Sequence, residues 1–225
     1  MKILVLAAMD KEVDLLLEHI DNVKEIERDN SRIWYGCISN NEVYLAKCGI
    51  GKVNSAINTT TLLRDLNPDL VINSGVAGGT GMPIGSLLIP DKVAYHDVWC
   101  GPGTNPGQAD GMPLYFIPSS LVTDLINESN FSLPIERGLL CSGDKFISKS
   151  EEIVSIKSDF PEVKAVDMES ASIAHACKKY GIPFAIIRVV SDTPGEGENI
   201  AQYNNFWETA PRKNFEVLKT LLERI

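Results

Sequence analysis

Apolar and polar residues fall along this chain in blocks rather than in strict alternation. Three apolar runs, at residues 3–7, 70–72 and 184–190, predict strands that are covered on both faces. The segments between these runs carry apolar residues at helical spacing. Helices are predicted over 10–19, with Asp10 as the N-cap, and over 51–66, 169–180 and 213–224.

A hairpin is predicted where residues 33–38 and 42–48 flank Ser39-Asn40-Asn41. The other predicted strands alternate with helices, which indicates the α/β class. We expect a three-layer αβα domain with a central twisted mixed sheet, much of it parallel, flanked by helices. The 225 residues suit one large domain and show no linker, so residues 1–225 are predicted to form a single domain.

Composition narrows the function. Thirty acidic against 21 basic residues give a net charge of −9, which disfavours binding to nucleic acid or to an anionic membrane. The first apolar run is too short for a transmembrane helix, and acidic residues follow where a signal peptide would continue. A cytoplasmic protein that binds a small molecule is therefore expected.

Cysteine and histidine spacing gives no indication of a metal site or a disulfide framework. The five cysteines are odd in number, widely spaced and without a C-x-x-C pair, so reduced thiols are expected. His19, His96 and His175 lie far apart in the sequence and are expected to be structural or surface residues. No metal and no organic cofactor is predicted.

Ligands of α/β folds gather at the carboxyl edge of the sheet, where two candidate acids are expected. Glu12, in the first turn of the first helix, is either a solvated carboxylate or a general base. Asp192 follows an apolar strand and is either a turn residue or, with a raised pKa, a general acid. The residues alone leave both alternatives open.

Three further segments have two interpretations each. The glycine-rich segment 75–81 matches neither common nucleotide-binding motif, and is either a tight turn or a binding loop. Glu169 opens a helix and is either a surface acid or a buried acceptor for a sugar diol. Phe146 and Ile147 are either core residues or a shelf for a flat base. Residues 99–113 are rich in glycine and proline and predict a long loop.

Six short motifs occur in order and together resemble one family. The resemblance is to the 5′-methylthioadenosine/S-adenosylhomocysteine nucleosidases of the nucleoside phosphorylase superfamily, from residue 1 to about residue 192. The motifs are Ala8-Met9-Asp10-Lys11-Glu12-Val13, Gly49-Ile50-Gly51-Lys52-Val53-Asn54, Asn73-Ser74-Gly75-Val76-Ala77-Gly78-Gly79, Ser142-Gly143-Asp144-Lys145-Phe146-Ile147, Val166-Asp167-Met168-Glu169 and Arg188-Val189-Val190-Ser191-Asp192.

The resemblance implies roles at named positions. Glu12 is expected to activate the attacking water, and Asp192 to protonate the purine at N7 as adenine leaves. Glu169 is expected to accept hydrogen bonds from the ribose hydroxyls, beside Met168. The other expected substrate-binding residues are the adenine-stacking Phe146, Ile147 through its backbone, the supporting residues Arg188 and Ser191, the glycine-segment residues Val76, Ala77 and Gly78, and Met9, Ile50 and Phe206 around the sugar and the 5′ substituent.

The activity that the resemblance implies is hydrolysis of the N-glycosidic bond of methylthioadenosine and adenosylhomocysteine, and of 5′-deoxyadenosine, in methionine salvage and the activated methyl cycle. The family also implies a homodimer whose 99–113 loop contributes to the neighbouring active site. Val76 stands where many members have serine, and the loop lacks a clear phenylalanine match. Asp167 replaces a more usual glutamate, a change to which we attach little weight.

Alternatives to this activity remain open. A nucleoside phosphorylase would use phosphate in place of water, but phosphate favours arginine, and the chain has Val71-Ile72-Asn73-Ser74 before its glycines. A futalosine or aminofutalosine hydrolase would use the same chemistry on another nucleoside. A non-catalytic nucleoside sensor would keep the pocket alone, which the presence of both Glu12 and Asp192 argues against.

Overall fold

A single mixed sheet forms the centre of the computed structural model, which describes all residues except 19, 29–30, 128–130, 132–133 and 210. Its strands, in chain order, are β1 (Lys2–Ala7), β2 (Asp21–Arg28), β3 (Ser31–Ile38), β4 (Asn41–Lys47), β5 (Leu70–Gly79), β6 (Leu87–Tyr95), β7 (Ile135–Ser142), β8 (Val163–Asp167) and β9 (Phe184–Asp192). They lie side by side in the order β2-β3-β4-β1-β5-β8-β7-β6-β9, and β5 also pairs with β9.

The central strands run parallel, as their unbroken apolar character predicts. β1 pairs in parallel with β4 and β5, and β5 pairs in parallel with β9. Antiparallel pairs join β2 to β3, β3 to β4, β5 to β8 and β6 to β9. The sheet is therefore mixed, and β1, β5 and β9 bring their carboxyl ends to one edge.

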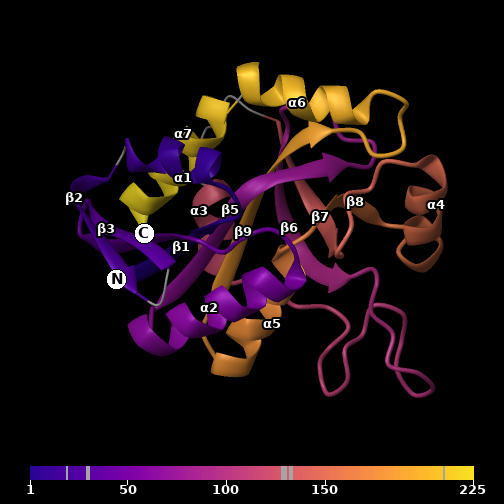
Figure 1. The fold of residues 1–225 in the computed structure, drawn as a ribbon, viewed down its shortest axis with the longest axis horizontal. Coiled ribbons are helices and arrows are strands. Elements are labelled where there is room, and N and C mark those ends of the chain that lie inside the picture. The colour runs from indigo at the N-terminus through magenta and orange to yellow at the C-terminus, as the bar shows by residue number, and fades with distance from the viewer. Residues whose placement is uncertain (19, 29–30, 128–130, 132–133, 210) are drawn as a thin grey trace.

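Helices cover both faces of this sheet, which confirms the three-layer αβα prediction. Figure 1 shows α2 and α5 side by side on one face, with α1, α6 and α7 toward the other. Separate clusters of buried side chains fill the two interfaces. The helices are α1 (Asp10–Leu17), α2 (Lys52–Leu66), α3 (Ser120–Asn127), α4 (Ser150–Asp159), α5 (Ser170–Tyr180), α6 (Asn199–Thr209) and α7 (Pro211–Arg224). None of these helices has the length and apolar composition needed to cross a bilayer, as far as the described residues show.

The hairpin and the four predicted helices are confirmed, with changes at their ends. The hairpin joins β3 to β4 through Ser39 and Asn40, in antiparallel register. The prediction that Asp10 caps α1 is wrong: Met9 is the N-cap, and the Asp10 carboxylate instead pairs with Lys47 at 2.8 Å. The predicted end of this helix at His19 lies outside the described residues.

Residues 75–79 of the glycine-rich segment are part of a strand rather than a turn or loop. β5 continues through Gly79 and pairs with both β9 and β8 there. Gly75 and Gly78 lack a positive φ, so their role is to allow close approach. A Cβ on Gly75 would lie 2.8 Å from Glu12 Oε1, and one on Gly78 would lie 2.4 Å from Pro194 Cγ.

Candidate active site

A cavity of about 350 Å³ opens at the carboxyl ends of β1, β5, β8 and β9. These strands are neighbours in the sheet, so segments far apart in sequence meet at one edge. The residues that the sequence predicted and that line this cavity are Met9, Glu12, Ile50, Val76, Ala77, Gly78, Phe146, Met168, Glu169, Arg188, Ser191 and Asp192.

Glu12 is buried at the start of α1, and its carboxylate is held by the main chain. Its Oε2 accepts the N–H groups of Ala8 at 2.8 Å and Met9 at 3.1 Å. Its Oε1 faces the bare Cα of Gly75. Burial raises the pKa of Glu12, while the charge of Arg188 opposes that rise. The side chain is thus held by main-chain N–H groups and lines the cavity.

Asp192 ends β9 and is also buried. Its Oδ1 accepts the Ser191 hydroxyl at 2.7 Å, and its Oδ2 accepts the Asn199 amide at 3.3 Å. Burial raises the pKa of Asp192 above its usual range, and these two hydrogen bonds act against the rise. The carboxyl group therefore retains a proton to higher pH than an exposed aspartate does.

Asn199 is a contact that sequence reasoning missed. One Nδ2 group donates both to Asp192 and, at 3.0 Å, to the carbonyl of Ile147. Ile147 itself lines a smaller adjoining cavity of about 40 Å³, together with Phe146 and Asp192. Asn199 opens α6 seven residues after Asp192, and asparagine is so common at helix starts that its position alone does not single it out.

Aromatic side chains border the same region. Phe146 is 40% exposed and meets Tyr203 edge to face, with ring centroids 5.5 Å apart. Tyr203 lines the cavity, and its hydroxyl donates to Met9 Sδ at 3.4 Å. The predicted wall residue Phe206 is 3% exposed and packs in the hydrophobic core below α6. Tyr203 and Phe206 both lie on α6, and their spacing in the sequence did not show which of them faces the cavity.

Glu169 immediately precedes α5 and lies in the cavity wall. Its Oε1 accepts the Gly51 N–H at 2.9 Å. Burial, reinforced by the nearby negative charge of Asp167, raises the pKa of Glu169 to about 7. The side chain is a buried hydrogen-bonding group, so the surface interpretation of Glu169 is excluded.

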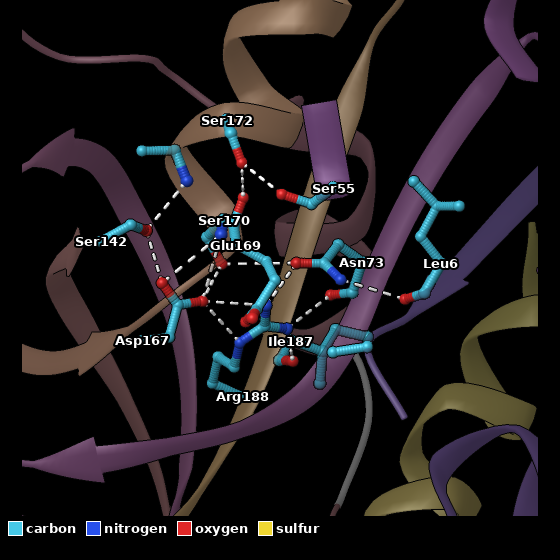
Figure 2. Close-up of polar contacts among 12 residues, drawn as sticks. Leu6, Ser55, Asn73, Ser142, Asp167, Glu169, Ser170, Ser172, Ile187 and Arg188 are labelled. Carbon is cyan, nitrogen blue, oxygen red and sulfur yellow. Dashed lines mark hydrogen bonds and ion pairs between the residues drawn. The ribbon is translucent and has the colours of Figure 1, made fainter. Parts of the chain in front are cut away.

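Behind Glu169 lies a buried ion pair that the sequence analysis undervalued (Figure 2). Arg188 Nε donates to Asp167 Oδ2 at 3.0 Å, and its Nη2 lies 2.9 Å from the same oxygen. The hydroxyls of Ser142 and Ser170 also donate to Asp167. Arg188 further contacts Asn73 through its side-chain and main-chain oxygens. Asp167 is therefore the counter-ion of the buried arginine.

The 99–113 loop supplies none of the described residues that line the cavity. Within it, Trp99 is 65% exposed and Cys100 is exposed as a free thiol. All five cysteines are free. In the described ranges, no group of three or more His, Cys, Asp or Glu side chains could hold a metal ion.

Comparison with known proteins places the fold in a family. A family model described as the phosphorylase superfamily matches residues 2–223. The chain belongs to the phosphorylase superfamily. Its similarity within the superfamily is to nucleosidases: it is 36% identical over 230 aligned positions to the 5′-methylthioadenosine/S-adenosylhomocysteine nucleosidase of Haemophilus influenzae (strain PittEE), with 100% of both chains covered.

Solved structures of other superfamily members agree. The nucleosidase of the same description from S. pneumoniae, with a transition-state inhibitor, is 37% identical with a TM-score of 0.94, and 99% of each chain is covered. The enzyme from Neisseria meningitidis, in complex with methylthio-immucillin-A, is 33% identical with a TM-score of 0.93, covering 100% of this chain and 99% of that one. The family resemblance expected from the six sequence motifs is confirmed.

Proposed function

We propose that this phosphorylase-superfamily chain hydrolyses the N-glycosidic bond of 5′-methylthioadenosine and S-adenosylhomocysteine, releasing adenine and the 5-substituted ribose. 5′-Deoxyadenosine is a further substrate, and the reaction serves methionine salvage and the activated methyl cycle. One observation carries the proposal: Glu12 and Asp192, from distant parts of the chain, are both buried and line one cavity. The names of the relatives support the substrate class.

On the base side, Asp192 acts as the general acid. As the glycosidic bond lengthens, negative charge builds up on the purine, and a proton delivered to N7 neutralises it. Burial raises the pKa of Asp192, so this group keeps its proton to a higher pH than an exposed aspartate does, and general acids contribute about 10²–10⁴-fold in rate. Phe146 and Ile147 form the walls against which the base lies.

On the opposite side, Glu12 acts as the general base. Water that attacks the anomeric carbon gives its proton to the Glu12 carboxylate as the C–O bond forms and the C–N bond breaks. The Ala8 and Met9 N–H groups hold Glu12 in place, which reduces the entropy lost in reaching the reactive geometry. An acid and a base on opposite sides of the sugar follow the plan of inverting glycosidases.

The ribose is held by Glu169 and Met168. A carboxylate offers two oxygens to a diol, and Glu169 has one oxygen engaged by the Gly51 N–H. Met168 supplies an apolar surface beside it. Sugar hydrogen bonds to Glu169 are expected to orient the anomeric carbon between Glu12 and Asp192.

Charge argues for water rather than phosphate as the nucleophile. Among the described residues that line the main cavity, Arg188 is the single basic side chain, and Asp167 neutralises it. Three further carboxyl groups, those of Glu12, Glu169 and Asp192, share the cavity. A phosphate dianion would be repelled there, because phosphate sites rely on uncompensated cations and N–H donors.

We also propose a cytoplasmic homodimer in which residues 1–225 act as one nucleosidase domain. Val53 and Ile57 lie one turn apart on α2 and are exposed in the single chain, next to the cavity residue Ile50. Trp99 on the long loop is exposed as well. A partner that covers these apolar side chains would also complete the 5′-substituent end of the pocket. Sedimentation of a fully active monomer would refute the dimer.

The purified chain incubated with each nucleoside, with and without phosphate, tests the activity. We expect adenine release at the same rate in both conditions, and little release in Glu12→Gln or Asp192→Asn. Asp10→Asn is a matched control, because its carboxylate is exposed and pairs with Lys47 instead. A requirement for phosphate would indicate a phosphorylase. Release of the purine base from futalosine or aminofutalosine alone would indicate a hydrolase of those nucleosides, and tight binding without release a sensor.

A further inference from the structure

The N-terminus of α2 has no acceptor of its own. Its N-cap is Gly51, and its first turn contains no acidic residue. Free N–H groups at a helix start need acceptors, and a negative charge there is favourable. Two carboxylates from other parts of the chain supply them. Glu169 Oε1 accepts the Gly51 N–H at 2.9 Å, and Asp144 Oδ1 accepts the Lys52 N–H at 2.6 Å.

Asp144 belongs to the segment that carries the base-binding residues. It follows β7 and precedes Phe146 by two positions. Its own N–H donates to Asp97 Oδ2 at 2.8 Å, and Asp97 Oδ1 accepts the Lys52 ammonium group at 2.7 Å. Lys52 is thus bound to Asp144 through its main chain and to Asp97 through its side chain, which closes a ring of three residues.

The contact between Asp144 and the start of α2 is tight. Gly51 has a φ of +87°, a conformation that favours glycine, and a Cβ at this position would lie 2.9 Å from Asp144 Oδ1. The peptide between Gly51 and Lys52 therefore lies directly against Asp144. The Gly51 N–H that holds Glu169 is one residue from the N–H that holds Asp144, so moving one carboxylate shifts the donor of the other.

We propose that Asp144 is a positioning residue: by fixing the Gly51–Lys52 peptide it holds Glu169 in place and links the base-binding segment to the ribose-binding carboxylate. Asp144 lines neither cavity and acts only through these hydrogen bonds. The kinetic consequences rest on the proposed function, since they require that Glu169 binds ribose. The structural consequence, at Gly51, does not require it.

Asp144→Ala, Asp144→Asn and a control test this link. Alanine removes the acceptor, whereas asparagine keeps an oxygen at the same position. Asp69→Ala is the matched control, because Asp69 Oδ2 accepts the Lys2 N–H at 2.7 Å at an exposed site outside both cavities. In the ligand-free protein, we expect amide hydrogen exchange of Gly51 to be at least about tenfold faster in Asp144→Ala, and near the wild-type rate in Asp144→Asn and Asp69→Ala.

The kinetic arm uses methylthioadenosine and free adenine. We expect Asp144→Ala to lower kcat/KM by about 10–100-fold while the Kd for adenine changes by less than about threefold, because adenine lacks the ribose that Glu169 holds. In a Glu169→Gln background, Asp144→Ala should lower kcat/KM by less than about twofold, because the Glu169 carboxylate that Asp144 positions has already been replaced. Asp144→Asn should recover most of kcat/KM.

Unchanged Gly51 exchange in Asp144→Ala would overturn the proposal, and so would an undiminished kinetic effect in the Glu169→Gln background. If the wild-type chain releases no adenine from any nucleoside, the proposed function fails, and the exchange measurement still decides whether Asp144 fixes Gly51. If Asp144→Ala does not fold, Asp144→Ser replaces it, because its hydroxyl is one bond too short to keep the acceptor position.

Discussion

Two sets of buried acids lie within the same sheet edge, and they are partnered differently. Asp167 has an arginine and two serine hydroxyls directed at its carboxylate. Glu12, Glu169 and Asp192 are held by N–H and hydroxyl donors and face the cavity, and burial raises the pKa of each. The comparison shows that burial alone does not mark a catalytic acid: an ion-paired carboxylate supports the fold, and an incompletely compensated one is available for proton transfer.

Arg188 influences both Asp167 and the acids that face the cavity. Its guanidinium is buried and directed at Asp167 and Asn73, and its positive charge also acts against the pKa rise of Glu12. At Glu169, burial and the negative charge of Asp167 outweigh the charge of Arg188, and the pKa rises to about 7. The buried ion pair therefore affects the pKa of Glu169, the residue proposed to bind ribose.

The largest effect is expected for Asp192→Asn. The amide keeps the shape of the side chain but cannot deliver a proton, so kcat should fall by about 10²–10⁴-fold with little change in nucleoside affinity. Single-turnover adenine release and equilibrium binding measure the two quantities. Turnover close to that of wild type would show that Asp192 is not the general acid.

Removing the buried ion pair between Asp167 and Arg188 should instead reduce the stability of the fold. Asp167→Ala leaves Arg188 buried without its counter-ion, and the free energy of unfolding should fall by about 3–5 kcal/mol. Urea denaturation measures it. Asp91→Ala is the control, because it breaks a more exposed ion pair with Arg137 and should cost less than about 1 kcal/mol. Equal losses in the two variants would contradict the distinction.

Glu169 should give a pH-dependent difference of intermediate size. Its folded pKa of about 7 is above the ordinary 4.5, so its contribution to stability is present below pH 4.5 and is lost as the pH rises through 7. Glu169→Gln removes this titration. Relative to wild type, the variant should gain roughly 1–3 kcal/mol between pH 5 and pH 8 in urea unfolding. A difference independent of pH would show that Glu169 titrates normally.

The smallest effect is expected for Val76→Ser, which introduces the hydroxyl that many family members have. Main-chain N–H groups of Ala8 and Met9 already hold Glu12, and the Val76 N–H also lowers its pKa. An added hydroxyl should change kcat/KM by less than about tenfold, the equivalent of one ordinary hydrogen bond. A larger gain in steady-state kinetics would show that Glu12 is held less firmly than its contacts indicate.

The sequence predicted the parts of the fold that depend on local pattern. The apolar runs and helical spacing gave the central strands, the hairpin and both α2 and α5. The extension of β5 through Gly79 was missed because glycines usually signal a turn, whereas here Glu12 and Pro194 press against the strand. Such a steric requirement arises only once distant segments have come together.

In the candidate site too, some features could be predicted from the sequence and others could not. The sequence motifs singled out Glu12, Glu169 and Asp192, and all three line the same cavity. The partners of these acids were not predictable, because they are set by tertiary contacts. Asp144 is 92 residues from the Lys52 N–H that it accepts, and Arg188 is 21 residues from Asp167. No local pattern indicates such pairings.

In the proposed reaction, Asp192 gives its proton to N7 of a purine nucleoside while Glu12 activates water. A 7-deaza analogue of methylthioadenosine, in which C–H replaces N7, tests it directly because the proton acceptor is removed and the rest of the ligand is kept. We predict that the wild-type chain binds this analogue but releases its base at least about 10²-fold more slowly than adenine. Release of the deaza base at the rate of adenine would contradict the account.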